Sequence, residues 1–148
     1  MGPHQIKYAL ERGHKVSIFT RGKTIPNVNT NVFGEEEHLV GYRENNLSAL
    51  ENRKWNVVID NSGRNVEWTR KTPQLLKDSC DFYIYTSSTG VYFPYTKANL
   101  NEENKVLLKV PETLEDEMLK MEYDYGVMKA NSEQETIKAF GKERSLLI

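Results

Sequence analysis

A tyrosine and a lysine stand four residues apart in the segment YDYGVMKANSEQ. On a helix, Tyr125 and Lys129 would share one face, so the phenol and the ammonium could point into one pocket. A cation beside a phenol favours the phenolate, which makes a general base usable near neutral pH. The alternative is an ordinary Tyr–Lys pair on a solvated helix, because this spacing by itself is common.

Hydroxyl side chains precede this pair along the chain, in the stretch FYIYTSSTGVY. A serine at a strand end, a tyrosine on a helix and a lysine one turn later would make a coherent site. The serine can hydrogen-bond a substrate carbonyl or alcohol, the tyrosine can exchange its proton, and the lysine can hold the phenolate and a ribose diol. The three residue types together predict chemistry on a small molecule that carries a hydroxyl or carbonyl group.

Length and charge are those of one globular domain. The chain has 148 residues, with Lys+Arg 20 against Asp+Glu 21, so no global field recruits nucleic acid or an anionic membrane. The single cysteine, Cys80, excludes an internal disulfide and fits a reducing compartment. No apolar run approaches the ~20 residues of a membrane span, and no signal peptide is recognisable. We therefore expect a cytoplasmic protein, and the scattered histidines predict no metal site.

Helical and strand patterns alternate along the sequence. The periodicity predicts helices over Gln5–Arg12, Leu47–Asn52, Val66–Lys77 and Asp124–Phe140. Strands are predicted over Val16–Phe19, His38–Gly41, Val57–Ile59, Phe82–Thr86 and Ser145–Ile148. Gly13 should end the first helix, and Pro73 should mark a kink or the start of a second helix. Solvated loops are expected around Gly22 and Pro26, over residues 35–37 and over residues 99–105.

Strands separated by helices predict an α/β fold with a parallel sheet and helices on both faces. In such sheets, ligands bind beyond the carboxyl ends of the strands. Three predicted strands end in small, polar or glycine-bearing segments, namely Thr20-Arg21, Asp60–Gly63 and Ser87–Gly90. This pattern suits a bound nucleotide better than a packed lid.

Four segments together resemble the NAD(P)-dependent epimerase/dehydratase family, the extended or atypical short-chain dehydrogenase/reductases. They are ERGHKVSIFTRG, VVIDNSG, TSSTGVY and YGVMKANSE, and they follow the family's order over nearly the whole chain. The resemblance implies one partial dinucleotide-binding domain over residues 1–148, a Rossmann-like doubly wound parallel sheet. It also implies Ser88 as the catalytic hydroxyl, with Ser87 as the near alternative, Tyr125 as the acid/base and Lys129 as the lysine.

The end of the first strand bears on the choice of cofactor. An acidic residue there would bind the ribose of NAD, whereas an arginine accommodates the 2′-phosphate of NADP. This chain has Thr20 and then Arg21, with Lys23 nearby, which favours NADP over NAD. The alternative is that both cations are loop charges without a ligand. By resemblance, the adenosine side would be lined by Asp60, Asn61, Ser62 and Gly63. A simple turn at the strand end would also explain these residues.

The sequence departs from the family pattern at both ends. It opens MGPHQIKYALERGH, already inside the first helix, so Gly2 would be the last glycine of a turn whose strand and earlier glycines are missing. It closes on SLLI, before the lobe that normally forms the substrate pocket. Because the missing strand would be central, its neighbours would face a gap with unpaired backbone groups, each costing ~1–3 kcal/mol. We therefore expect a fragment that binds dinucleotide poorly and turns over little. Tyr42, where relatives often place an aspartate near the adenine, adds to this expectation.

Three functions stay open on these residues. The favoured one is an NADP-linked epimerase, dehydratase or reductase, for which nucleotide sugars are a frequent substrate class in the family. The second is RNA association, because IFTRGK, VIDNSGR and YTSSTGVY also resemble the chloroplast stem-loop RNA-binding relatives; the net charge of -1 argues against it. The third is an inert or structural fragment. Val127, Met128 and Ile137 are expected to face the core, with a homodimer partner as the alternative.

Overall fold

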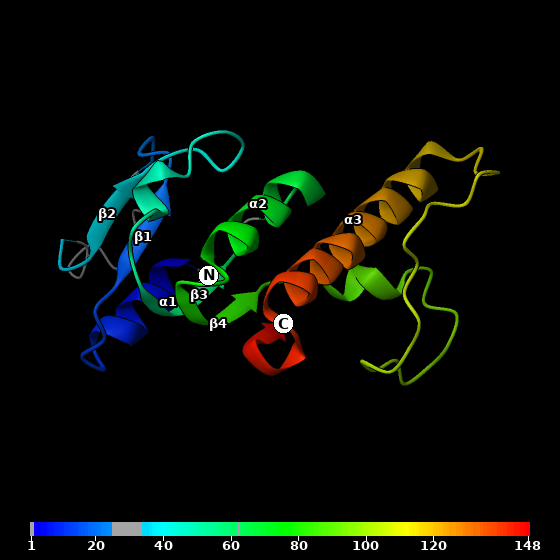
Figure 1. Cartoon of the computed structure of the whole chain (residues 1–148). Helices are drawn as coiled ribbons and strands as arrows, with labels where there is room; N and C mark the ends of the chain where they lie inside the picture. The colour runs from blue at the N-terminus through cyan, green and yellow to red at the C-terminus, as the bar shows by residue number, and fades with distance from the viewer. Residues whose placement is uncertain (1, 25–33, 62) are drawn as a thin grey trace. The chain divides into compact units, whose positions relative to one another are not determined.

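The computed structural model describes residues 2–24, 34–61 and 63–148 as a mixed α/β chain (Figure 1). The chain divides into two compact units, residues 1–53 and residues 54–148, and each contains a small parallel sheet. The coarse prediction of an α/β fold with parallel strands is therefore confirmed. A single domain over residues 1–148 stays a prediction. The predicted loop residue Pro26 and the predicted site residue Ser62 lie outside the described residues.

The first unit pairs two short strands beside one helix. Its elements are α1 (Gly2–Leu10), β1 (Ser17–Thr20), β2 (Glu37–Val40) and the 3-10 turn η1 (Ser48–Leu50). The strands run parallel, with Ser17 opposite Glu37 and Thr20 opposite Val40. Gly13 follows α1 with a φ of +75°, a left-handed conformation that glycine adopts without strain, so the predicted stop signal is confirmed. The predicted helix at 47–52 is only a 3-10 turn.

The acidic segment 35–37 is not the solvated loop that the sequence predicted. Glu37 begins β2, and Glu36 is buried, with 6% of its surface exposed. The Glu36 carboxylate accepts the Gly34 N–H at 2.9 Å and contacts the His38 Nε2 at 2.8 Å. Burial alone would raise the pKa of Glu36, but these hydrogen bonds hold that pKa below its usual range. A buried carboxylate is stable here because the neighbouring backbone and ring supply donors, which the residue types alone do not reveal.

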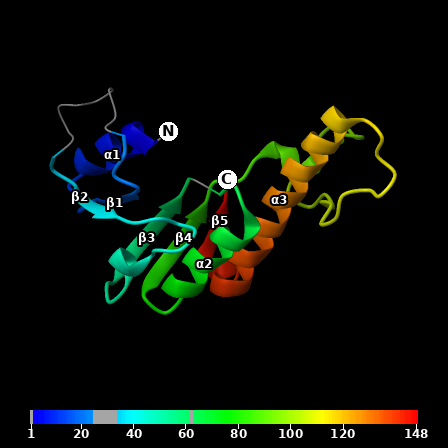
Figure 2. The same cartoon turned by 90° about the horizontal axis from the view of Figure 1, so that it is seen from above.

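The second unit is a three-stranded parallel sheet with two crossover helices (Figure 2). In chain order its elements are β3 (Trp55–Asp60), α2 (Val66–Leu76), β4 (Cys80–Tyr85), the 3-10 turn η2 (Thr89–Tyr92), α3 (Glu117–Phe140), the 3-10 turn η3 (Lys142–Arg144) and β5 (Ser145–Leu147). The strand order is β3-β4-β5, in register so that Asp60 lies opposite Tyr85 and Tyr85 opposite Leu147. Each predicted strand of this unit is present, with boundaries shifted by one or two residues.

Both crossover helices of the second unit lie on the same face of its sheet. Helices α2 and α3 pack directly against each other, as right-handed crossovers between neighbouring strands require. Under them Tyr83 and Tyr85 are fully buried, and the Tyr83 ring lies 4.9 Å from the ring of Phe140. On the opposite face Val57 and Ile59 stay about half exposed. The described helices of this unit thus cover one face, not the two that the sequence predicted.

Helix boundaries depend on side-chain caps. Helix α3 begins seven residues before the predicted Asp124, because Asp116 accepts the N–H groups of Met118 at 2.8 Å and Leu119 at 3.1 Å. The first turns that follow this cap carry mostly exposed side chains, so their hydrophobic pattern is weak. Pro73 lies inside α2, which continues through it, so no second helix starts there.

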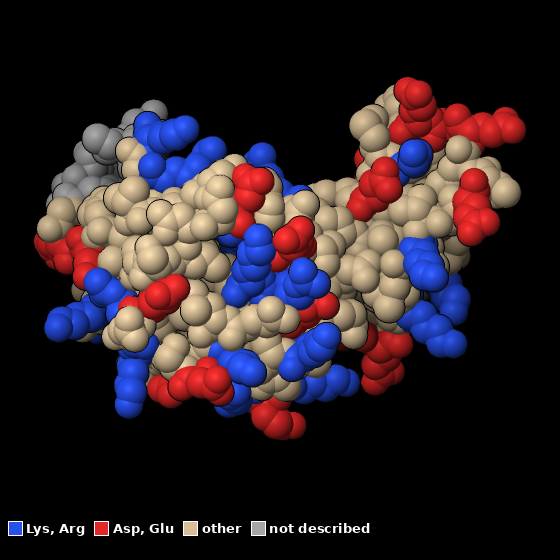
Figure 3. Space-filling model, turned by 45° about the horizontal axis from the view of Figure 1, so that its top comes forward, with Lys and Arg blue, Asp and Glu red and all other residues tan. Residues whose placement is uncertain are grey.

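The surface gives no sign of a membrane span or of one dominant charge. None of the described helices combines the length and apolarity needed to cross a bilayer. On the face drawn in Figure 3, basic and acidic side chains are interspersed without a continuous basic stripe. That distribution matches the near balance of Lys+Arg 20 and Asp+Glu 21.

Asn65 caps α2, and this contact can be tested. Its side-chain oxygen accepts the N–H groups of Glu67 at 2.9 Å and Trp68 at 3.2 Å. Asn65→Ala removes that acceptor and should lower the free energy of unfolding by about 1 kcal/mol. Asn65→Asp keeps an acceptor and should stay close to the wild type in urea denaturation. Equal stability of the two variants would show that the cap contributes nothing.

Candidate functional site

The predicted catalytic serine and tyrosine converge on Gly90. A β-carbon placed on Gly90 would lie 3.3 Å from the Ser88 Oγ and 3.1 Å from the Tyr125 Cδ1. Ser88 Oγ also accepts the Gly90 N–H at 3.1 Å, which caps η2. The serine hydroxyl and the tyrosine ring therefore both lie against the buried backbone of Gly90, which leaves no room for a side chain there. The Tyr125 side chain itself is 44% exposed.

Gly126 brings the helix this close. A β-carbon on Gly126 would lie 2.3 Å from the carbonyl oxygen of Gly90, a separation that real contacts do not show. The backbone of α3 therefore rests directly on η2, and the adjacent Tyr125 is carried over Gly90. The sequence alone did not reveal this role of Gly126. The available signal was the glycine itself: inside a helix it costs about 1 kcal/mol relative to alanine, which points to a packing requirement.

Lys129 lies one turn further along α3 and is buried, with 6% of its surface exposed. Its Nζ donates to the backbone carbonyl of Thr86 at 2.9 Å and lies 5.0 Å from the centre of the Tyr85 ring. The Thr86 hydroxyl in turn donates to the side-chain oxygen of Asn61 at 2.7 Å. The lysine thus holds the end of β4 immediately before the two serines. An ammonium has three N–H donors, so two remain after the bond to Thr86.

The two serines have different partners. The Ser87 hydroxyl donates a hydrogen bond to the carboxylate of Glu133, whereas the Ser88 Oγ lies against Gly90, which the Tyr125 ring also contacts. Burial raises the pKa of Glu133, and the bond from Ser87 and the nearby Lys129 ammonium oppose that rise. Of the two serines, Ser88 is therefore the one that shares the contact with Gly90 with Tyr125. Glu133 was missed from the sequence, although its spacing of four residues from Lys129 was visible.

The predicted adenosine-side residues in the second unit are engaged within the fold. Asp60 is buried, and its Oδ2 accepts a hydrogen bond from the Tyr83 hydroxyl at 2.7 Å. A β-carbon on Gly63 would lie 2.4 Å from the Tyr85 hydroxyl oxygen, so glycine is required there for packing. Asn61 is exposed. The contacts of Asp60 and Gly63 account for both residues as part of a strand-ending turn, the alternative that the sequence left open.

The other predicted cofactor residues belong to the first unit. Gly2 is the first residue of α1, and Thr20 ends β1, where its hydroxyl oxygen accepts the Gly22 N–H at 3.1 Å. Arg21 and Lys23 follow directly and are exposed. Within the described part of the chain, neither cation forms an ion pair with a carboxylate.

Tyr42 stands near these cations, just beyond β2. Its hydrogen bond with Glu44 and the negative charge of that carboxylate raise the pKa of Tyr42, whereas the positive charge of Arg21 opposes the rise. The carboxyl ends of β1 and β2 therefore bring Arg21 and Tyr42 within electrostatic reach of each other. This is the position where the sequence analysis noted a departure from the family.

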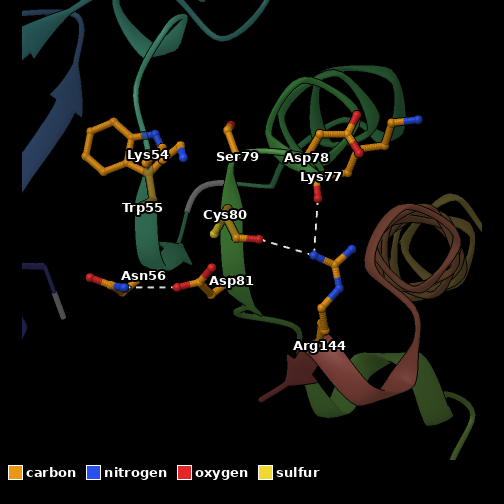
Figure 4. A pocket seen from close by; sticks show the side chains of 9 residues that line it. All are labelled: Lys54, Trp55, Asn56, Lys77, Asp78, Ser79, Cys80, Asp81 and Arg144. Carbon is orange, nitrogen blue, oxygen red and sulfur yellow. Dashed lines mark hydrogen bonds between the residues drawn. The ribbon is translucent and has the colours of Figure 1, made fainter.

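A separate pocket opens at the amino ends of β3 and β4 (Figure 4). It has a volume of about 450 Å³ and none of the predicted site residues line it. Arg144 reaches into it and donates to the carbonyl of Lys77 at 3.2 Å and that of Cys80 at 3.3 Å. Because the last carbonyls of a helix lack partners within it, this contact secures the end of α2. Burial raises the pKa of the Cys80 thiol, which makes it a poor nucleophile.

Scans of the sequence and structure against protein-family models, curated proteins and solved structures found no match. Over residues 2–24, 34–61 and 63–148, no group of three or more His, Cys, Asp or Glu side chains could hold a metal ion. The side chains around Gly90 are the basis for the function proposed below.

The contact between Gly126 and Gly90 predicts an unusual response to alanine. At an open helix position, Gly→Ala stabilises by about 1 kcal/mol. At Gly126 the added carbon meets a backbone oxygen that cannot rotate away, so Gly126→Ala should destabilise the protein by roughly 1–3 kcal/mol in thermal unfolding. Gly2→Ala is the matched control, because nothing lies within 4 Å of a β-carbon there. If Gly126→Ala is as stable as the control, α3 does not rest on Gly90.

Proposed function

We propose that the residues around Gly90 are the catalytic site of an NADP-linked oxidoreductase of the epimerase, dehydratase or reductase type. The substrate would be a small molecule with a hydroxyl or carbonyl group. One observation carries this proposal: Ser88 and Tyr125 both lie against Gly90, and Lys129 is buried one turn away on the helix that bears the tyrosine. These are the three residue types that the sequence predicts for this chemistry.

The strand arrangement supports a finer description of the fold, a Rossmann-like doubly wound sheet. Both sheets are parallel, and their orders are β1-β2 and β3-β4-β5. The candidate residues also follow the carboxyl ends of strands, Arg21 after β1 and Ser88 after β4, where such sheets bind ligands.

The three side chains divide the chemistry among them. Because Ser88 Oγ accepts the Gly90 N–H, its own proton is available for a hydrogen bond to the substrate oxygen. The Tyr125 hydroxyl would take the proton of a substrate alcohol during oxidation, or return it to a carbonyl oxygen during reduction. The two remaining N–H donors of Lys129 would stabilise the phenolate and hold a ribose hydroxyl. The nicotinamide ring, when bound, supplies the hydride acceptor or donor.

The fit to NADP is uneven among the predicted residues. Arg21 and Lys23 are exposed, adjacent to a strand end and without a carboxylate partner in the described residues, which suits a 2′-phosphate. In contrast, Asp60 and Gly63 are held by contacts to Tyr83 and Tyr85. The phosphate end of the cofactor is therefore better supported than its adenosine side. Reduction, epimerisation and dehydration can begin with the same oxidation step, and the site suits each of them.

Removal of the Tyr125 hydroxyl tests the catalytic assignment. Tyr125→Phe should lower NADPH-linked turnover by roughly a hundredfold or more, because the proton carrier is lost. Its unfolding temperature should stay unchanged, because only the hydroxyl of a partly exposed side chain is removed.

Lys129→Met should weaken both NADPH binding and turnover. Turnover is measured by nicotinamide absorbance over a panel of nucleotide sugars and carbonyl compounds. Dinucleotide contact is measured by saturation-transfer NMR at high protein concentration.

Two neighbours on α3 serve as matched controls for these variants. Tyr123→Phe removes the same hydroxyl from a ring that packs edge-on against Phe93, with ring centres 4.8 Å apart. Lys138→Met removes an exposed ammonium from the same helix. Both should behave as the wild type. Unchanged turnover in Tyr125→Phe would remove the catalytic assignment, and a wild-type chain without any NADPH contact would remove the enzymatic proposal.

The cofactor preference is tested at Arg21. Arg21→Ala should lower the affinity for NADP roughly tenfold and leave the affinity for NAD unchanged, because only NADP carries the 2′-phosphate. Arg70→Ala, which removes an exposed guanidinium from the second unit, is the control for net charge. Both dinucleotides are compared by NMR line broadening at one salt concentration. An equal loss for NAD and NADP would show that Arg21 does not recognise that phosphate.

A further inference from the structure

Glu133 extends the row of polar residues on α3. Tyr125, Lys129 and Glu133 follow one another at four-residue intervals, so they share one face of the helix. The Glu133 carboxylate accepts a hydrogen bond from the hydroxyl of Ser87, a residue on the turn after β4. Its side chain is partly buried and lies close enough to the Lys129 ammonium for their charges to interact.

The turn after β4 is held at three consecutive residues. The carbonyl of Thr86 accepts from Lys129 at 2.9 Å, the hydroxyl of Ser87 donates to Glu133, and the hydroxyl oxygen of Ser88 accepts the Gly90 N–H at 3.1 Å. Two of these three contacts come from charged groups on α3. The position of Ser88 thus depends on the hydrogen bonds that α3 makes to Thr86 and Ser87.

A carboxylate is a costly choice for this contact. Burial of a carboxylate is unfavourable, and a neutral amide could accept the same hydrogen bond from Ser87. The ammonium of Lys129, which is itself buried, favours the charged form of Glu133, although burial outweighs it and raises the pKa of this carboxyl. Glutamate at this place therefore does more than accept one bond, because it links the position of Ser87 to the charge of Lys129.

We propose that Glu133 is a positioning residue of the site, whose carboxylate, together with Lys129, fixes the turn 86–88 so that Ser88 stays against Gly90 beside the ring of Tyr125. This role rests on the proposed function, in which Ser88 donates a hydrogen bond to the substrate oxygen. Among the described contacts, Glu133 binds Ser87 and is not a neighbour of Gly90. It therefore acts through Ser87 and is not itself catalytic.

The experiment is a pH titration of the 148-residue chain by NMR, without dinucleotide. The Gly90 amide and the Tyr125 ring resonances are followed between pH 4 and pH 8. Both should shift in one step as Glu133 loses its proton, and the midpoint should lie above the ordinary glutamate range because burial raises the pKa of this carboxyl. Glu133→Gln should lose the step, and its spectrum at neutral pH should resemble that of the acidic wild type.

The surroundings of Glu133 make this step readable. The other titratable groups described as interacting with it are Lys129 on the same helix and Tyr92 on η2. Burial, followed by the charges of Glu102 and Glu133, raises the pKa of Tyr92, away from the range of the titration. All three histidines of the chain lie in residues 1–53. Glu122→Gln, an exposed position on the same helix, is the matched control and should retain the step.

Two results would overturn the role of Glu133. One is a step that persists in Glu133→Gln, and the other is a Gly90 and Tyr125 spectrum of that variant identical to the neutral wild type. Because no dinucleotide is present, the titration is independent of the Tyr125→Phe turnover test. Failure of the turnover test would remove the proposed function, whereas failure of the titration would remove only the role of Glu133.

Discussion

The close approach of two glycines is the constraint on which the candidate site depends. Any side chain at Gly126 would overlap the carbonyl of Gly90 and push α3 away from η2. That displacement would move Tyr125 away from Ser88 and draw Lys129 back from the end of β4. Gly126 costs the helix about 1 kcal/mol relative to alanine. The backbone contact that it permits brings Tyr125 to Gly90 and Lys129 to the end of β4.

Charge compensation is the second requirement, because the site contains both a buried ammonium and a partly buried carboxylate. Removal of either charge from water is unfavourable, and each has hydrogen-bond partners that reduce the cost. Lys129 binds a carbonyl of the turn after β4, and Glu133 binds a hydroxyl of the same turn. The two charged side chains thereby hold the strand end, and the positive charge of Lys129 favours the ionised form of Glu133. The polar site and the stability of the turn are consequences of the same contacts.

Residue type alone does not separate a ligand contact from a structural one. Asp60, Asn61 and Gly63 have the composition of a nucleotide-binding turn and also that of a simple strand end. In the fold, the Asp60 carboxylate accepts the buried hydroxyl of Tyr83, and Gly63 makes room for the hydroxyl of Tyr85. The two tyrosines come from a strand distant in sequence. No local sequence pattern could have shown that these tyrosines would contact Asp60 and Gly63.

The sequence by itself determined the type and order of most elements, because periodicity, turn residues and caps act over only a few positions. It also determined that Tyr125 and Lys129 share a helix face, since that follows from spacing alone. Tertiary structure decided which residues meet: Ser88 rather than Ser87 beside Tyr125, Glu133 bound to Ser87, and Glu36 buried instead of solvated. It also decided that the parallel strands form two sheets and that both helices of the second unit share one face. These outcomes depend on backbone distances between segments far apart in the chain, and such distances leave no periodic trace in the sequence.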